Sequence, residues 1–134
     1  MATACFHSPA GHTLAIPVIP SGANVWNSGG PGDVRLTAEW PVTEPGSIRY
    51  ANYTQGPDSM HMKWWQVTVS PSYAGGAVTV PDLRNVAGWN GSLDLVAGAL
   101  TDWGVGSSTS PSPDSGPRDG TREVYTDQRG TIIP

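Results

Sequence analysis

The stretch Lys63-Trp64-Trp65-Gln66-Val67-Thr68-Val69 decides the fold class. Every second position is apolar at Trp65, Val67 and Val69, and successive side chains of an extended strand point to opposite faces. β-Branched and aromatic residues also favour strands over helices. We therefore predict a half-buried strand with these three side chains on its core face and Trp64 on the opposite face.

Similar short runs recur on both sides of this stretch. Residues 34–40 alternate between apolar and polar side chains and end at Pro41, which cannot donate to a strand ladder. On the same grounds we predict strands over 48–53, 77–80, 93–97, 100–105 and 122–133. Residues 73–76, Tyr-Ala-Gly-Gly, are predicted to form a tight hairpin turn that pairs 77–80 back onto 63–69. The pattern predicts an all-β fold, an antiparallel β-sandwich of about seven to eight short strands.

The N-terminal part of the chain differs from the rest. Residues 13–20, Thr-Leu-Ala-Ile-Pro-Val-Ile-Pro, are apolar but broken by proline, which suits an edge strand or an extended arm. We therefore divide the chain into an extended Pro-rich N-terminal arm with a Gly-rich loop, residues 1–33, and a β-sandwich domain, residues 34–134. Within that domain, the Ser- and Pro-rich stretch 107–117 has little to bury and is predicted to be a solvated loop.

Composition narrows the range of partners. A chain of 134 residues fits one domain. Its formal net charge is −4, with only seven Lys and Arg, so we expect no basic surface for phosphates and no nucleic-acid partner. No apolar run approaches the ~20 residues that span a bilayer, so we expect no membrane insertion. Residues 1–10 lack the pattern of a signal peptide, so either an export signal has been removed or the chain is made as it stands, for instance within a virion.

The second half of the chain carries a family resemblance. Residues 78–89 read Val-Thr-Val-Pro-Asp-Leu-Arg-Asn-Val-Ala-Gly-Trp, followed by 95–98, Trp103 and a closing run at 129–132. In this order, over roughly residues 67–134, the chain resembles fibronectin type III and immunoglobulin-like β-sandwich domains of bacterial secreted proteins and lipoproteins. The resemblance implies an extracellular β-sandwich and no particular activity. Residues 1–33 have no counterpart in that pattern.

Motifs for catalysis are not recognisable in the sequence. It contains neither a phosphate-binding P-loop nor a nucleophile elbow. Cys5, His7 and His12 are of types that bind zinc or copper, but their spacing matches no known site, so we expect ordinary polar residues there. No pair among the eleven Asp and Glu stands out for glycoside cleavage. We therefore expect no enzyme, no catalytic residues, no cofactor and no metal.

The six tryptophans carry the functional argument. Strand parity and apolar neighbours predict that four are core residues, Trp40, Trp65, Trp89 and Trp103. Trp64 lies opposite the core face, at the same parity as Met60 and Met62, and we expect the N-terminal arm to cover these three. An arm from a neighbouring copy would turn the same cluster into an assembly interface. Trp26 stands apart in a polar stretch, Asn24 to Asn27.

Two functions from different classes compete. The first is a non-catalytic structural or assembly module of an extracellular surface, filament or virion that contacts other protein chains, as a homo-oligomer or within a larger structure. Its candidate interaction residues are Trp26, Met60, Met62, Trp64, Ile16, Val18 and Ile19. The alternative is a carbohydrate-binding module that stacks glycans on exposed Trp64, Trp26, Tyr50 or Tyr53. We predict the first function, located outside the cell, at a cell surface or in a virion.

Overall fold

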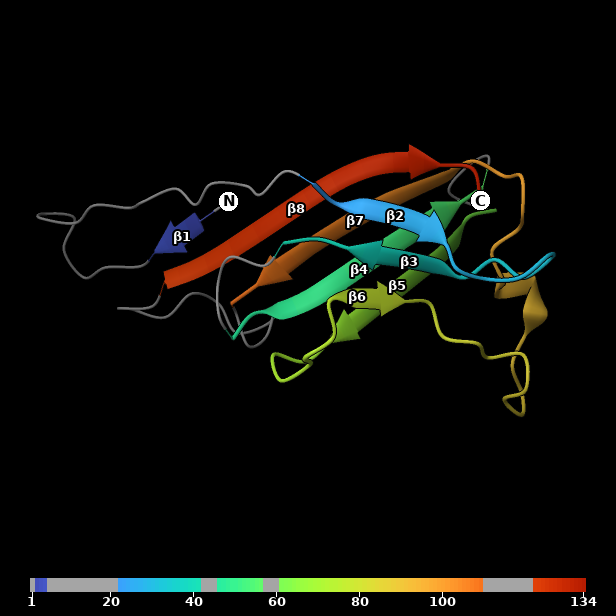
Figure 1. Cartoon of the computed structure of the whole chain (residues 1–134), viewed down its shortest axis with the longest axis horizontal. Helices are drawn as coiled ribbons and strands as arrows, with labels where there is room; N and C mark the ends of the chain where they lie inside the picture. Colours follow the sequence, from blue (N-terminus) through green and yellow to red (C-terminus); the bar gives the residue numbers. More distant parts are fainter. Residues whose placement is uncertain (1, 5–21, 42–45, 57–60, 110–121) are drawn as a thin grey trace, which may run out of the picture.

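The computed structural model describes residues 2–4, 22–41, 46–56, 61–109 and 122–134 (Figure 1). These residues form antiparallel β-structure and one short 3-10 helix. The strands are β1 (Ala2–Ala4), β2 (Asn24–Asn27), β3 (Leu36–Glu39), β4 (Ile48–Gln55), β5 (Lys63–Val69), β6 (Ala77–Thr79), β7 (Thr101–Ser108) and β8 (Arg122–Ile132), and the 3-10 helix is η1 (Gly91–Leu93). Within the described part of the chain, no helix has the length and apolar character to cross a membrane. The prediction of an all-β fold is confirmed.

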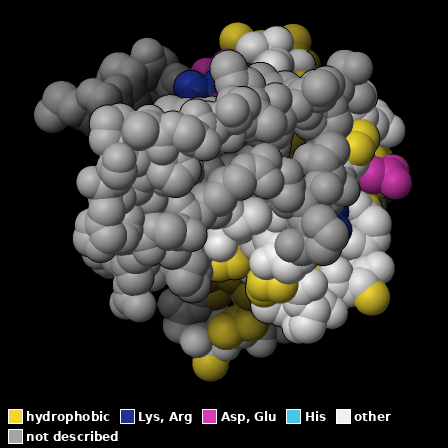
Figure 2. All heavy atoms as spheres, turned by 90° about the vertical axis from the view of Figure 1, so that its left-hand side faces the viewer, with side chains coloured by type: hydrophobic (Ala, Val, Ile, Leu, Met, Phe, Trp, Pro, Cys, Tyr) yellow, Lys and Arg dark blue, Asp and Glu magenta, His cyan; other side chains and the backbone are white. Residues whose placement is uncertain are grey.

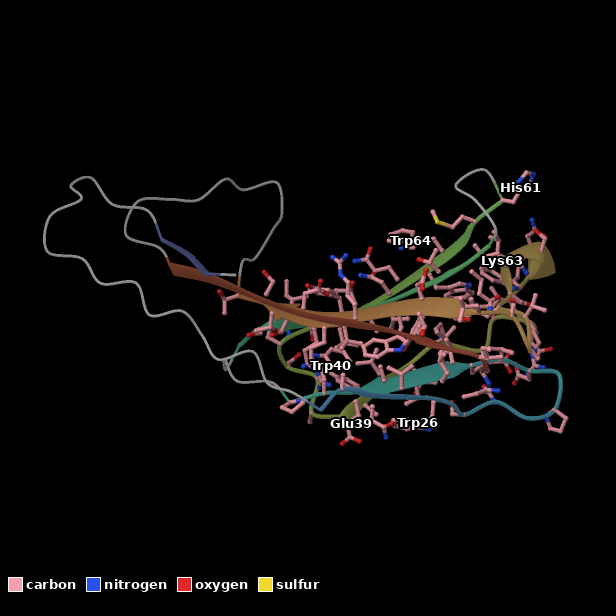
Figure 3. All side chains as sticks on the ribbon, turned by 90° about the horizontal axis from the view of Figure 1, so that it is seen from above. Trp26, Glu39, Trp40, His61, Lys63 and Trp64 are labelled. Carbon is pink, nitrogen blue, oxygen red and sulfur yellow. The ribbon has the colours of Figure 1, made fainter. Side chains whose placement is uncertain are left out.

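Two antiparallel sheets pack face to face. The larger has the order β1-β8-β7-β4-β5, and the smaller has the order β2-β3-β6. Seen from above, they form two layers with Trp40 between them (Figure 3). The predicted core face of residues 34–40 is confirmed, because its four apolar side chains are all buried, Val34, Leu36, Ala38 and Trp40. The larger sheet meets them with fully buried side chains, Ala51, Tyr53 and Val105.

The strand over 63–69 is confirmed with its predicted bounds and faces. β5 runs from Lys63 to Val69, and its side chains alternate between half-buried and exposed. Trp65, Val67 and Val69 pack against the core, whereas Trp64 points outward. The neighbouring β4 shows the same alternation, and its odd-numbered side chains also face the core, since Arg49, Ala51, Tyr53 and Gln55 are buried.

The predicted hairpin at residues 73–76 is wrong. β5 lies at an edge of the larger sheet and β6 at an edge of the smaller one, so this segment crosses between sheets. The glycines here do not have the positive φ that the commonest two-residue hairpins need. Instead, the Tyr73 ring folds over Gly75, where a Cβ would clash with it. The Arg49 guanidinium, on β4, donates from Nη1 to the Gly75 carbonyl and from Nη2 to the Gly76 carbonyl, both at 2.7 Å.

The predicted strand over 93–97 is also wrong. This segment follows η1, whose N-cap Asn90 accepts a hydrogen bond from the Ser92 amide through its side chain. The Gln55 side-chain amide donates to the Val96 carbonyl at 2.9 Å and accepts from the Val96 amide at 2.8 Å. One side chain therefore satisfies the backbone groups that a neighbouring strand would otherwise have paired.

Two strands lie in the part of the chain assigned to the N-terminal arm. β2 pairs with β3, with Asn24 opposite Glu39 and Asn27 opposite Leu36. β1 pairs with β8. Both were missed because short polar or small-residue segments carry little alternation. The predicted arm core at 13–20 lies outside the described residues, as does most of the predicted loop at 107–117, although β7 extends into that range as far as Ser108.

Seen from the left-hand side of Figure 1, the described part shows small groups of hydrophobic side chains and few charged ones (Figure 2). Apolar side chains that reach the surface on other sides of the molecule are described below.

Candidate binding surfaces

The outer face of the larger sheet is the first candidate surface. We use "outer face" for the side that points away from the smaller sheet. Strand register places four short rows of side chains there. The members are Tyr50, Asn52 and Thr54 on β4; Trp64, Gln66 and Thr68 on β5; Asp102, Gly104 and Gly106 on β7; and Asp127, Arg129 and Thr131 on β8.

A trough of about 210 Å³ lies in this face. Gly104 provides its floor, because a residue without a side chain lies opposite Asn52 on one neighbour and Arg129 on the other. We call it the Gly104 trough; its outer-face lining is Asn52, Thr54, Asp102, Gly104, Asp127 and Arg129. A Cβ added at Gly104 would lie 3.7 Å from Asp127 Oδ1, an ordinary contact. A methyl group would therefore fit at Gly104, in ordinary contact with the Asp127 and Arg129 side chains.

The lining is polar and rich in acceptors. Arg129 Nε pairs with Asp127 Oδ2 at 2.7 Å, and this hydrogen bond raises the pKa of Arg129 above its ordinary value. Within the described structure, Asn52 Oδ1 is buried and has no hydrogen-bond partner. With Asp102 also present, the trough has two carboxylates against one guanidinium, a formal charge of about −1.

Gly106, two residues further along β7, is covered. The Tyr50 ring lies across it and donates from its hydroxyl to the Thr126 carbonyl at 3.2 Å. Tyr50 is therefore held against the sheet by both contacts.

The aromatic residues considered for sugar stacking do not share one surface. Trp64 is 57% exposed on the outer face. Trp26 is half-buried on the opposite side of the sandwich, on the outside of the smaller sheet (Figure 3). Tyr53 is fully buried, and burial raises the pKa of its hydroxyl well above the ordinary value. A platform that combines all four rings is ruled out, and Trp64 and Tyr50 remain on the outer face.

The residues proposed for interaction have different outcomes. Trp64 and Met62 are exposed, at 57% and 48%; the arm that we expect to cover them lies outside the described residues, so the covering stays a prediction. Met60 and the three arm residues, Ile16, Val18 and Ile19, lie outside the described residues. Their roles as interaction residues stay predictions.

A second surface, which the sequence did not indicate, lies at the end of the sandwich near the C-terminus. Four large apolar side chains are about half exposed or more there, Leu93 (47%), Val96 (50%), Leu100 (59%) and Ile133 (66%). We call this surface the apolar end. The Gly98 amide donates to the Pro134 carbonyl at 2.9 Å, which ties the loop to the end of β8. Leu100 comes directly before Thr101 and Ile133 directly after Ile132, the last register pair of β7 and β8, so both residues lie at this end of the sandwich.

Of the four tryptophans predicted for the core, Trp40, Trp65 and Trp103 lie inside or against it, and Trp89 contacts the ring of Trp65 outside the core cluster. Trp40 is 4% exposed, and the Arg49 guanidinium carbon lies 4.7 Å from its ring centre, a cation–π distance. Trp65 and Trp103 pack against the core cluster. Trp89 is half-buried, with its ring centre 5.3 Å from that of Trp65.

Ionic groups elsewhere form small structural clusters. Arg84 bridges Asp82 at 2.8 Å and Asp33 at 3.1 Å. The hydrogen bonds from Arg84 hold the pKa of Asp82 well below its usual range. Among the described residues, no three His, Cys, Asp or Glu side chains gather into a set that could hold a metal ion.

The chain matches no known family model, and no curated protein matches it significantly.

Proposed function

We propose that this chain is a non-catalytic structural or assembly module of an extracellular surface, filament or virion, and that it associates with further copies of itself through the apolar end. The observation that carries the proposal is the group Leu93, Val96, Leu100 and Ile133, each about half exposed or more. Contiguous apolar patches on soluble proteins mark interaction sites. The hydrogen bonds of Trp65 to Leu93, of Gln55 to Val96 and of Gly98 to Pro134 hold the segments that carry these side chains at the same end of the sandwich.

The hydrogen bonds around the apolar end support a preformed surface. The Lys63 ammonium group donates to the Asp94 carbonyl, and the Trp65 indole donates to the Leu93 carbonyl at 2.8 Å. Together with the Gln55 contacts to Val96, these bonds fix the loop before any partner arrives. A preformed surface loses less conformational entropy on binding than a mobile one.

The strand order supports a fibronectin type III-like arrangement. A three-stranded sheet, β2-β3-β6, faces the run β8-β7-β4-β5 of the larger sheet. Three strands packed against four, with β1 as an addition at the edge, make a β-sandwich, which is the fold that the resemblance of residues 67–134 implies. The extracellular setting follows from that resemblance, since such domains belong to secreted proteins.

Light scattering behind a sizing column tests the association, with the full chain run over a hundredfold range of concentration. We expect mass above the monomer that rises with concentration. Leu100→Asp combined with Ile133→Asp places two charges on the apolar end and should return the chain to a monomer. Thr68→Asp, an exposed position elsewhere on the outer face, is the matched control and should leave the mass unchanged. A wild-type chain that stays monomeric at every concentration contradicts the proposal.

A further inference from the structure

We propose that the Gly104 trough binds one ring of a neutral, hydroxyl-rich sugar, while Trp64 stacks on the adjoining ring of the same glycan. This proposal does not rest on the association through the apolar end.

The size of the trough fits a single ring. Pockets for drug-sized ligands measure about 300–1,000 Å³, whereas this trough measures about 210 Å³. It exists because β7 carries glycine at position 104, where any larger side chain would occupy the same space. The floor is the backbone of a central strand, held on both sides by β4 and β8, so the shape is rigid before a ligand arrives.

The chemistry of the lining selects hydrogen-bond donors. Asp102 and Asp127 present carboxylate oxygens to the trough, and a sugar hydroxyl can donate to such an oxygen. Hydrogen bonds to a carboxylate are also stronger than those between neutral groups. Arg129 and Thr54 add donors at the rim for the hydroxyl and ring oxygens.

The charge of the trough argues against acidic glycans. Arg129 is paired with Asp127, so Asp102 remains as an uncompensated carboxylate among the trough-lining residues. A uronate or sulfate group placed there would meet a like charge at close range. The selected class is therefore uncharged sugars.

Trp64 is placed to extend the site beyond one ring. It lies directly opposite Thr54, which in turn lies opposite Asp102. Neighbouring strands are about 4.8 Å apart, so the indole stands one strand beyond the trough lining, about one sugar ring away. Indole rings offer a broad apolar face for the C–H groups of a sugar, and this one is 57% exposed.

Isothermal titration calorimetry of the full chain tests the proposal with a fixed panel of probes. The neutral probes are cellohexaose, maltohexaose and mannohexaose, and polygalacturonate is the acidic probe. We expect at least one neutral probe to bind and polygalacturonate to bind more weakly. Gly104→Val fills the trough with a residue that strands favour, and it should weaken binding about tenfold or more. Trp64→Ala should weaken binding to a similar extent.

Controls separate the trough from the fold and from association. Asp102→Asn keeps the size of the side chain and removes the carboxylate, so it should weaken binding with no change in melting temperature. Thr68→Val, outside the trough on the same face, should bind as the wild type does. Any of three results overturns the proposal. The first is that no neutral probe binds, and the second is that polygalacturonate binds best. The third is that Gly104→Val, Trp64→Ala and Asp102→Asn all bind like the wild type. The mass of Gly104→Val in solution tests the association independently and should equal that of the wild type.

Discussion

The Tyr53 side chain places a polar atom in the core of this sandwich without a hydrogen-bond partner among the described residues. The Tyr53 hydroxyl is buried between the sheets and, within the described structure, accepts and donates no hydrogen bond. A buried hydroxyl without a partner costs free energy relative to the unfolded chain, where water satisfies it. Its ring, however, fills a central position next to Trp65 and Trp103 in strand register.

Tyr53→Phe should keep or raise the stability at neutral pH by up to about 1 kcal/mol, because it removes the unpaired hydroxyl and keeps the ring. The same substitution should alter the response to alkali. Burial raises the pKa of Tyr53 in the folded chain, whereas the unfolded chain ionises near its ordinary value of about 10. Stability is therefore intact below about pH 10 and falls above it, and the fall should be shallower in Tyr53→Phe. Urea unfolding at pH 7 and pH 11 measures both effects; a large loss of stability at pH 7 would contradict the first.

Two glycines on β7 make a matched pair. A Cβ at Gly106 would overlap the Thr126 carbonyl oxygen and the Tyr50 hydroxyl, whereas one at Gly104 meets nothing closer than 3.7 Å. Gly106→Ala should therefore cost about 1–3 kcal/mol, and Gly104→Ala should change stability by less than about 0.5 kcal/mol. Thermal melting of the two variants decides this; equal losses would mean that the trough is not open.

At the scale of elements, β4 supports the connection between the sheets. Arg49 donates to the carbonyls of Gly75 and Gly76 and lies over the Trp40 ring. Arg49→Met keeps much of the side-chain bulk and removes both hydrogen bonds, so it should cost about 1–3 kcal/mol. Arg49→Lys, which cannot reach both carbonyls in the same fork geometry, should fall between Arg49→Met and the wild type. Urea midpoints measure the order, and a midpoint for Arg49→Met equal to the wild type would contradict it.

The two faces of β5 predict different consequences for adjacent tryptophans. Trp65 packs against the core and the Trp89 ring, and its indole N–H donates to the Leu93 carbonyl. Trp65→Ala should therefore destabilise the fold by about 3–5 kcal/mol. Trp64 is exposed, so Trp64→Ala should cost less than about 1 kcal/mol. Chemical denaturation of both variants measures the difference. Equal losses would show that the face assignment is wrong.

How well the sequence predicts an element depends on which groups form hydrogen bonds with its backbone amides and carbonyls. β3 and β5 alternate regularly and pair with neighbouring strands, so their pattern predicts them, and β8 is predicted from the apolar residues it carries, Val124, Tyr125 and Ile132. Residues 93–97 look similar in sequence. There, however, the Gln55 side chain of β4 pairs with the backbone amide and carbonyl of Val96, in place of a neighbouring strand. Local alternation cannot reveal a side chain that is so distant in sequence. For the candidate sites, parity predicts the exposed face of Trp64. The Gly104 trough and the apolar end depend on register between distant strands, which the sequence pattern does not contain.

On the scale of the whole molecule, the two sheets share one core. Leu36 and Val78 of the smaller sheet and Tyr53 and Val105 of the larger are buried in the same cluster. Neither sheet has a separate set of buried apolar side chains among the described residues. We therefore expect a single cooperative unfolding transition, with far-UV circular dichroism and tryptophan fluorescence coinciding in urea. Two separated transitions would mean that the sheets are stable independently.

The position of β8 in the larger sheet also bears on how the chain is made. β8 is the last strand in sequence, yet it pairs along the full length of β7 and lies next to the centre of the sheet. While the chain is being synthesised, β7 emerges before its partner and presents an unpaired edge, which favours pairing with other chains. Gly104 and Gly106 on that strand lower its intrinsic tendency to form β-structure, so we expect wrong pairing to be slower during the interval before β8 arrives.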